Sequence, residues 1–280
     1  MKQNLARSAT LRDLDFEHLI CTELVKLNSL HYGYWDGDEE LTLENFRRAQ
    51  DRYTQTLIAL IPQQVTRILD VGCGIGDVSM ALVSKGYIVT ALSPDKNQKK
   101  YFEGYDHKNL AFLNTDFESF WTGEKFDLVL MSESQNYFDM DLGFKKCASL
   151  LDRVGYLLVS GNFRIDDSKE FRRVTHIESE YIERASHYGF SLTKSIDITE
   201  NILPTVQFGE EIYKSYFSPS LGTLKYYIQN AAPIRLKLLK WIFRKELKQL
   251  MVTLRDWSER ANPALFRERV RYMRFLFTFQ

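Results

Sequence analysis

The chain has few cysteines and lacks any long apolar run. Its three cysteines, Cys21, Cys73 and Cys147, lie far apart and form no C-x-x-C pair. This spacing offers neither a disulfide framework nor a zinc site, so we expect no metal centre. The apolar stretches fall well short of the roughly eighteen residues that span a bilayer, and the first residues include no apolar signal segment. We therefore expect a cytoplasmic protein, with at most peripheral contact to a membrane.

An excess of charge of one sign is also lacking, because 37 Lys and Arg balance 37 Asp and Glu. The charges are nevertheless spread unevenly, since residues 225–280 carry thirteen basic and four acidic side chains. The composition, 44% hydrophobic and 26% charged, is that of an ordinary globular protein. With 280 residues the chain can bury a full core. We expect a basic C-terminal module on an acidic body.

Glycines gather in one place, the sequence ILDVGCGIGD of residues 68–77. An apolar run and Asp70 precede Gly72, Gly74 and Gly76, and an apolar-periodic stretch follows, which predicts a strand, a tight turn and a helix. Glycine tolerates positive φ and lets a ligand lie against the backbone, while a helix start offers unpaired N–H groups. The spacing is G-x-G-x-G, not the G-x-G-x-x-G of dinucleotide sites. We expect a nucleotide-like cofactor here; the alternative is an ordinary tight turn.

Strand-like and helix-like segments alternate through the middle of the chain, which predicts a parallel sheet with helices on both faces. The predicted strands span residues 67–71, 87–92, 110–114, 126–131, 155–160 and 190–199. The predicted helices span residues 14–27, 43–61, 77–84, 95–103, 142–151, 170–187, 209–217, 221–231, 234–251 and 263–270. The aromatic residues 272–279 fit a seventh strand that returns to the sheet; the alternative is an unpaired terminal tail.

The glycine turn together with Asp70 resembles motif I of class I S-adenosylmethionine (SAM) methyltransferases. The resemblance implies SAM as the cofactor, with Asp70, Gly72, Gly74 and Gly76 at its methionine end. It also implies an α/β fold, a Rossmann-like seven-stranded sheet that is mostly parallel with an antiparallel last strand, with helices on both faces and a helical lid. We expect an N-terminal helical cap over residues 1–60, the SAM-binding core over 61–200 and 270–280, and a basic lid over 201–269.

Further residues are candidates for holding the rest of SAM. Asp116, just past the third predicted strand, suits the adenine amino group, with Phe117 as a flat apolar neighbour; alternatively, Asp116 is a turn or helix-cap residue. The second strand ends in Leu-Ser-Pro where most class I enzymes carry Glu or Asp, so Ser93 or Asp95 would bind a ribose hydroxyl. This turn resembles cyclopropane-synthase-like methyltransferases. Ser132, at the end of the fourth strand, is the last candidate.

The segment HYGYWD, residues 31–36, makes the resemblance more specific. With the glycine turn it is similar to the small-molecule branch that contains tocopherol and sterol C-methyltransferases, glycine-betaine-forming N-methyltransferases and sugar O-methyltransferases, over residues 27–205. In that branch the segment closes over the cofactor, which implies that Tyr32 and Tyr34 line the methyl-transfer chamber. The alternative is a structural aromatic cluster, and we expect His31 to be structural.

The fourth predicted strand ends in MSESQNYF, residues 131–138, where sugar O-methyltransferases of this branch carry a His that is absent here. Glu133 is the nearest ionisable group and Tyr137 lies one helical turn on, so these two and Tyr32 are the candidate catalytic residues. Methyl transfer depends mainly on proximity and alignment, and only some acceptors need a base. Alternatively, Glu133 only hydrogen-bonds the cofactor or a neighbouring backbone group.

A predicted helix in the basic region has two different faces. One carries Lys237, Lys240, Arg244 and Lys248 with Trp241, and the other is apolar. The plain interpretation is a solvated face above a buried stripe; the sharper ones are an anionic membrane surface, an acidic carrier protein or an anionic head group. No nucleic-acid-binding motif accompanies the charge, so we expect no nucleic-acid partner.

The combined hypothesis is an enzyme that transfers a methyl group from SAM to carbon or oxygen of a hydrophobic small molecule, such as a terpenoid, lipid, polyketide or aromatic compound. The 19 Phe and 15 Tyr, many of them in the predicted lid, favour such an acceptor. The rivals are a SAM-fold cyclase, isomerase or binding protein that transfers no methyl group, an N-methyltransferase of a small amine, and a membrane-docked interaction protein.

Overall fold

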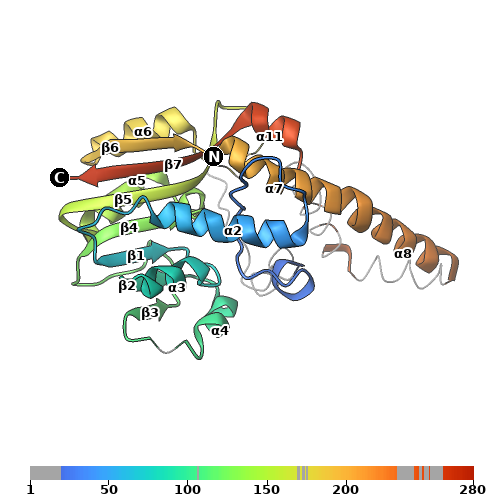
Figure 1. Cartoon of the computed structure of the whole chain (residues 1–280), viewed down its shortest axis with the longest axis horizontal. Helices are drawn as coiled ribbons and strands as arrows, with labels where there is room; N and C mark the ends of the chain where they lie inside the picture. The colour runs from blue at the N-terminus through green and yellow to red at the C-terminus, as the bar shows by residue number, and fades with distance from the viewer. Residues whose placement is uncertain are drawn as a thin grey trace.

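A seven-stranded sheet forms the centre of the computed structural model (Figure 1). The strand order is β3-β2-β1-β4-β5-β7-β6, with β1 to β5 parallel and β7 antiparallel to both of its neighbours. The strands are β1 (Arg67–Val71), β2 (Ile88–Leu92), β3 (Leu110–Leu113), β4 (Phe126–Ser132), β5 (Leu151–Arg164), β6 (Phe190–Asp197) and β7 (Val270–Phe279). The structure describes residues 20–105, 107–168, 171, 174, 176–231, 243–245, 248, 252 and 261–280. The predicted α/β sheet with an antiparallel last strand is confirmed.

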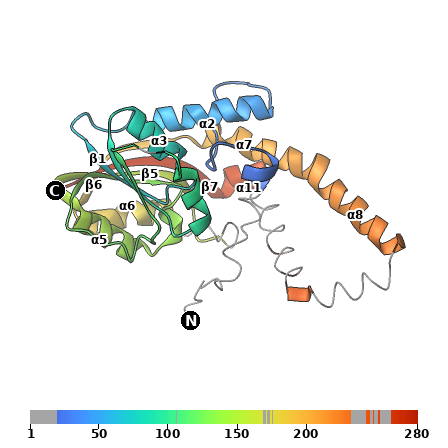
Figure 2. The same ribbon diagram turned by 90° about the horizontal axis from the view of Figure 1, so that it is seen from below.

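Helices cover both faces of this sheet (Figure 2). One face carries α2 (Leu43–Ile58), α3 (Asp77–Ser84), α7 (Thr199–Ile212) and α11 (Pro263–Arg269), and the other carries α5 (Met140–Leu150) and α6 (Glu178–His187). A short helix, α4 (Lys99–Phe102), lies between β2 and β3. Each face has its own apolar core, with Leu57 and Phe266 in the first and Phe144 and Tyr181 in the second. The sheet is therefore buried between two helical layers, as its parallel strands require.

Two helix starts show how the sequence sets these bounds. Thr42 caps α2 by accepting a hydrogen bond from the backbone N–H of Asn45 at 3.2 Å. Asn262 caps α11 in the same way, accepting from the N–H of Leu265 at 3.1 Å, with Pro263 in the first helical turn. These side chains satisfy N–H groups that have no partner within the helix.

Three predicted helices differ from the structure. Residues 95–103 form a 3-10 turn and then α4, because the Asp95 carboxylate caps the N–H of Asn97 at 2.9 Å and starts a tight turn instead. The predicted helix 170–187 begins only with α6, because the preceding Ile177 bridges to Arg164 at the end of β5. Of the predicted helix 14–27, the described part holds a single π-helical turn, Ile20–Leu24.

The predicted helices 209–217 and 221–231 are parts of one longer helical arm. It consists of α7, a π-helical turn (Tyr213–Phe217) and α8 (Ser218–Ala231), and it extends away from the sheet (Figure 1). The predicted helix 234–251 lies mostly outside the described residues, as do Lys237, Lys240 and Trp241 of its basic face. Within the described ranges, no helix has the length and apolarity needed to cross a membrane.

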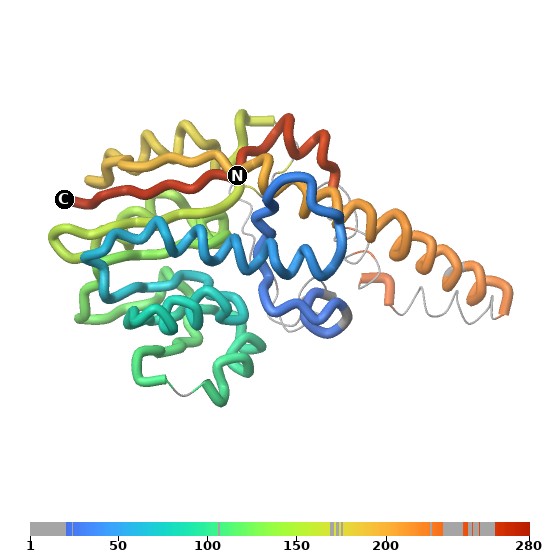
Figure 3. The backbone as a smooth tube through the Cα atoms, viewed as in Figure 1, coloured from blue at the N-terminus to red at the C-terminus, as the bar shows by residue number. Residues whose placement is uncertain are grey.

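The segment before α2 loops beside α2 and α7 (Figure 3). The backbone N–H of Trp35 donates to the carbonyl of Asn201 at 2.9 Å, and the Asn201 amide donates to the Trp35 carbonyl at 3.0 Å. The Trp35 side chain is 2% exposed and packs parallel to Phe46. Residues 31–36 are thus fixed between two helices at one end of the sheet.

Candidate active site

The glycine turn lies at the carboxyl end of β1, beside the end of β4. From β1 the chain crosses to β2 and β3 on one side, and then returns to β4 and β5 on the other. Such a switch point is where ligands bind in doubly wound sheets. The N–H groups of Gly72 and Cys73 both donate to the carbonyl of Leu92, which ties the turn to the end of β2.

The three glycines have positive φ angles of 75°, 58° and 90°, but their surroundings differ. A Cβ on Gly72 would lie 2.5 Å from the Cβ of Ser134, and one on Gly76 would lie 2.6 Å from the Phe102 ring. A Cβ on Gly74 would meet no atom closer than a Leu30 methyl at 3.8 Å. Gly72 and Gly76 are therefore required by packing, whereas Gly74 has room above it.

This free space fits the methionine end of SAM, because the helix start next to it is uncapped. The N-cap residue of α3 is Gly76, which has no side chain to bond the first N–H groups of the helix. Such groups favour a carboxylate or phosphate ligand. The room at Gly74 and the uncapped N–H groups thus suit the cofactor that the resemblance implies.

Asp70 lies beneath the glycine turn and is 1% exposed. Its carboxylate accepts a hydrogen bond from the Ser79 hydroxyl at 2.5 Å, which joins β1 to α3. Burial raises the pKa of Asp70 to about 7, although the Ser79 bond favours the ionised form. In this structure Asp70 holds the turn from below, and its predicted role in cofactor binding stays a prediction.

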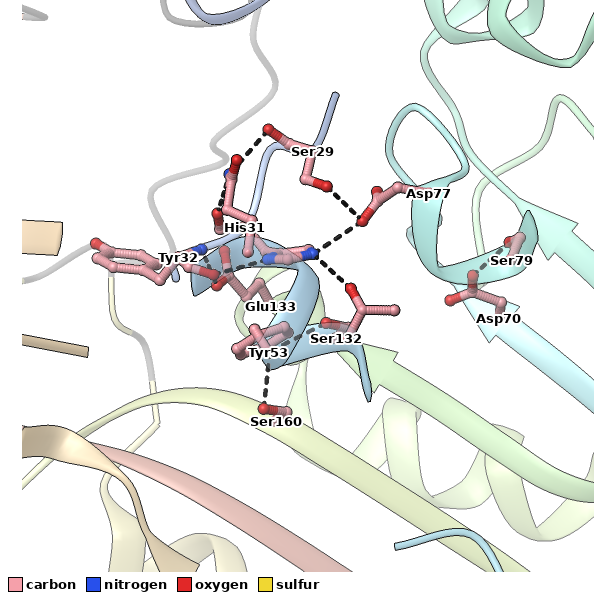
Figure 4. A network of polar contacts seen from close by, with 12 residues as sticks. Ser29, His31, Tyr32, Tyr53, Asp70, Asp77, Ser79, Ser132, Glu133 and Ser160 are labelled. Carbon is pink, nitrogen blue, oxygen red and sulfur yellow. Dashed lines mark hydrogen bonds and ion pairs between the residues drawn. The ribbon is translucent and has the colours of Figure 1, made fainter. Parts of the chain in front are cut away.

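A partly buried ion pair joins the HYGYWD segment to the start of α3. The Asp77 carboxylate accepts from His31 Nε2 at 2.8 Å and from the Ser29 hydroxyl at 2.9 Å (Figure 4). His31 Nδ1 lies 2.7 Å from the Tyr32 carbonyl, so both ring nitrogens face acceptors. Burial is the largest effect and lowers the pKa of His31, but Asp77, Glu133 and the Tyr32 carbonyl together raise it by more, and the net shift is upward. The ring is therefore a structural cation that fixes the segment beside the glycine turn.

Glu133 follows β4 and has a left-handed backbone, with φ of 62°. Its Oε1 accepts from the backbone N–H of Tyr32 at 3.0 Å and from the Tyr272 hydroxyl at 2.5 Å. Burial raises the pKa of Glu133, against the opposing effects of His31 and of these hydrogen bonds. A carboxylate with a raised pKa is a stronger base than an ordinary one and so is better suited to accept a proton. The structure thus brings two of the candidate catalytic residues, Glu133 and Tyr32, into contact.

A chain of hydroxyl groups continues from Glu133 into the sheet. The Tyr53 hydroxyl lies 2.9 Å from that of Tyr272, 3.1 Å from that of Ser132 and 2.8 Å from that of Ser160 (Figure 4 shows the part around Tyr53). Burial raises the pKa of Tyr53 to about 12, and that of Tyr272 well above its usual value. Both tyrosines therefore stay protonated, and Tyr272 donates to Glu133.

Tyr32 and Tyr34 contact two different residues of β7. The Tyr32 ring packs edge-on against Tyr272, with the ring centroids 5.6 Å apart. The Tyr34 ring lies 5.6 Å from the guanidinium of Arg274, a buried residue of β7. Arg274 also bonds Thr56 at 2.9 Å, which fixes α2 to the sheet. Of the two tyrosines, Tyr32 is the one next to Glu133.

The other predicted cofactor residues make local contacts. The Ser93 hydroxyl bonds Gln98 and accepts from the N–H of Asp95 at 3.1 Å. The Asp116 carboxylate accepts from the N–H of Ser119 at 2.7 Å, the turn-capping role that the sequence left open. Phe117 is buried in the core, with its ring 5.2 Å from that of Phe138. The contacts of Ser93, Asp95, Asp116 and Phe117 with adenine and ribose stay predictions.

Tyr137 is far more exposed than the other two catalytic candidates, Glu133 and Tyr32. Its side chain is 84% exposed, on a 3-10 turn between β4 and α5, whereas Tyr272 is fully buried. The tyrosine that donates to Glu133 is thus Tyr272 from β7 and not the one four residues along the chain.

Residues 69–159 match a family model described as a methyltransferase domain, and this stretch holds the glycine turn and Glu133. This part of the chain is similar to a methyltransferase domain. The predicted resemblance to class I SAM-dependent small-molecule methyltransferases is confirmed. A 27-O-demethylrifamycin SV methyltransferase from Amycolatopsis mediterranei is 30% identical over 113 residues, which cover 34% of this chain and 40% of the relative. The alignment thus spans less than half of that relative.

Solved structures extend the likeness of fold beyond residues 69–159. The cyclase SpnF has a TM-score of 0.66 at 16% identity, covering 94% of this chain and 93% of its own. A geranyl diphosphate C-methyltransferase from Streptomyces coelicolor, crystallised with S-adenosyl-L-homocysteine, has a TM-score of 0.65 at 14% identity, covering 97% and 96%. At these identities the likeness shows a shared fold alone.

Sequence reasoning missed three residues of this site, which lie on α3, α2 and β7. Asp77 bonds His31 of the HYGYWD segment, while Tyr53 and Tyr272 bond the candidate residues Ser132 and Glu133. The one signal for Asp77 was its place directly after the last glycine, at a helix start. Tyr53 and Tyr272 gave no local signal, because their pairing exists only in the folded chain.

Proposed function

We propose that the chain is a SAM-dependent methyltransferase that transfers a methyl group to carbon or oxygen of a hydrophobic small molecule. The observation that carries this proposal is the room above Gly74, a left-handed glycine at an uncapped helix start. This space lies at the start of α3, where His31 anchors the HYGYWD segment that also brings Tyr32 to Glu133. A cofactor site next to a buried carboxyl group suits group transfer in a water-poor chamber.

The roles of the residues follow from their contacts. Gly74 and the first N–H groups of α3 hold the methionine end of SAM, which supplies an electrophilic methyl group when bound. The Tyr32 ring forms one wall, and its backbone N–H orients Glu133. For a hydroxyl acceptor, Glu133 takes the proton as the oxygen becomes methylated, while Tyr272 keeps the carboxylate oriented.

The neighbours' names support an apolar acceptor and leave the methylated atom between carbon and oxygen. One solved neighbour is named as a geranyl diphosphate C-methyltransferase, and the curated relative as a 27-O-demethylrifamycin SV methyltransferase. The partly buried aromatic rings of Tyr32 and Tyr34 fit such an acceptor. Among the described residues, no group of three or more His, Cys, Asp and Glu is placed to hold a metal ion.

Calorimetry with SAM tests the cofactor site. Gly74→Val fills the free space and should weaken SAM binding by more than about a hundredfold. Gly123→Val is the matched control, because a Cβ there meets nothing within 4 Å and its φ is ordinary. Circular dichroism checks that both variants are folded. Unchanged affinity in folded Gly74→Val would contradict the placement.

Incubation with methyl-labelled SAM and a lipid or metabolite extract, followed by mass spectrometry, tests the reaction. Label should appear in an apolar product, and Glu133→Gln should reduce turnover about a hundredfold while leaving SAM affinity nearly unchanged. Tight SAM binding without any labelled product would favour a cyclase or binding protein instead. Full activity of Glu133→Gln would end its role as the base.

A further inference from the structure

The helical arm leaves a long stretch of side chains in solvent. From α7 it continues through the π-helical turn Tyr213–Phe217 into α8, and it extends beyond the sheet and its covering helices (Figures 1 and 2). Along α8 every side chain that the structure describes is exposed except Ile228, which is half-buried. A helix that packed against the body would bury its apolar positions.

The apolar residues of α8 lie on one side of the helix. At 100° per residue, Leu221, Leu224, Tyr227 and Ile228 fall within an arc of roughly 120°. Leu224 is 55% exposed and Tyr227 69%. Tyr226 is equally exposed, at 70%, but points to the opposite side of the helix. Leucine and tyrosine side chains in such an arc form an unpaired apolar stripe, which we call the α8 stripe.

The charge of this region has one sign. Residues 212–245 contain seven Lys and Arg and no Asp or Glu. Lys214 pairs with Glu210 of α7 at 2.7 Å, while the other six basic residues follow within and after α8 in the sequence. An uninterrupted basic segment attracts an anionic surface.

We propose that the α8 stripe, together with the basic residues that lie within and after α8 in the sequence, docks the protein on a lipid bilayer that carries anionic head groups. An apolar stripe with leucine and tyrosine next to many cations is the pattern of a helix that lies in a membrane interface. An acidic protein would satisfy the charge but not require exposed leucines. A second copy of the chain would place two wholly basic segments against each other, which their repulsion opposes.

Docking would also set the orientation of the site. The arm begins in α7, where the Thr205 hydroxyl accepts from the backbone N–H of Gly33 at 3.1 Å and from the Trp35 indole at 2.8 Å. The HYGYWD segment is therefore fixed to the base of the arm. The proposal does not depend on SAM chemistry, so its failure and that of the proposed function are distinguishable.

Flotation of the full chain with vesicles tests the proposal. Binding to vesicles of phosphatidylcholine with phosphatidylglycerol should exceed binding to phosphatidylcholine alone by at least about tenfold, and should weaken as salt is raised. The quadruple variant Lys237→Glu, Lys240→Glu, Arg244→Glu and Lys248→Glu should lose at least about tenfold in affinity for the anionic vesicles.

A matched pair of variants tests the α8 stripe itself. Leu224→Gln and Tyr227→Gln should each weaken vesicle binding several-fold, while Tyr226→Gln on the opposite side leaves it unchanged. All three positions are exposed, so the variants should keep the circular dichroism of the parent protein. Equal binding to both kinds of vesicle, or equal effects of Tyr226→Gln and Tyr227→Gln, would overturn the proposal. A dimer in sedimentation that Leu224→Gln dissociates would overturn it in favour of a second copy.

Discussion

The HYGYWD segment and the helical arm are both rich in aromatic and charged side chains. They differ in whether these side chains are buried or exposed. In the HYGYWD segment Trp35 is buried, and the buried His31 pairs with a half-buried Asp77. In the arm Tyr227 is exposed, and the sequence of residues 212–245 holds basic residues but no acid. Composition alone therefore does not distinguish a site's cover from a surface.

This difference indicates which side chains stabilise the folded state and which are available for binding. Side chains with buried partners hold the folded state together, because removing one leaves a cavity or an unpaired charge. Exposed side chains contribute little to folding, so a contiguous apolar stripe of them indicates a binding surface. Variants in the two regions should accordingly differ in the free energy of unfolding.

Gly72→Ala should give the largest effect. The new Cβ would lie 2.5 Å from the Cβ of Ser134, at a φ of 75° that an alanine adopts only under strain. We expect a loss of about 3 kcal/mol in urea unfolding. Adding Ser134→Gly should restore part of the lost stability, because it removes the clash. A Gly72→Ala protein as stable as the parent would contradict the tight packing of the turn.

Much of the fold could be predicted from the sequence because its central elements have strong local signals. The apolar run of β1 and the glycine turn specify a strand, a turn and the helix α3 with the observed bounds, and the apolar run of β4 specifies a strand one residue shorter than the observed one. The errors fell where a tertiary or side-chain contact prevailed over helix periodicity, as in the bridge of Ile177 to Arg164.

The site was predicted only in part, for a related reason. The glycine turn and Glu133 are visible along the chain, but the partners of Glu133 come from distant segments. Tyr272 lies 139 positions away on β7, and Tyr53 reaches it from α2. A single sequence does not reveal such pairs, whereas the 3.6-residue period of α8 is readable without any partner.

His31→Gln should give the next largest effect, and it should depend on pH. The pKa of His31 is raised above its ordinary 6.5 when the chain folds, so its stabilising contribution is fully present below pH 6.5. It is lost as the pH rises through the raised value. We expect a cost of about 2 kcal/mol at low pH and less in alkaline solution, measured by urea unfolding across pH. A cost independent of pH would show that the ring is neutral.

Asp70→Asn should have a smaller effect of the opposite sign. Because burial raises the pKa of Asp70 from 3.8 to about 7, the folded state favours the protonated acid. Its stabilisation is present below pH 3.8 and is lost as the pH rises through about 7. Relative to Asp70→Asn, the parent protein should thus lose stability on going from acid to neutral pH, as measured by urea unfolding at both pH values. The same pH profile for both proteins would contradict this.

Leu224→Gln should have the smallest effect on the free energy of unfolding. It tests the contrast between the exposed arm and the buried parts of the chain most directly. Leu224 is 55% exposed in α8, so the change should alter the free energy of unfolding by less than about 0.5 kcal/mol. Leu57→Ala is the reference in α2, where the fully buried side chain should cost about 3 kcal/mol when truncated. If Leu224→Gln instead destabilised the protein as much as Leu57→Ala, the arm would have a packing partner within the folded chain. Its stripe would then belong to the core and not to a membrane-facing surface.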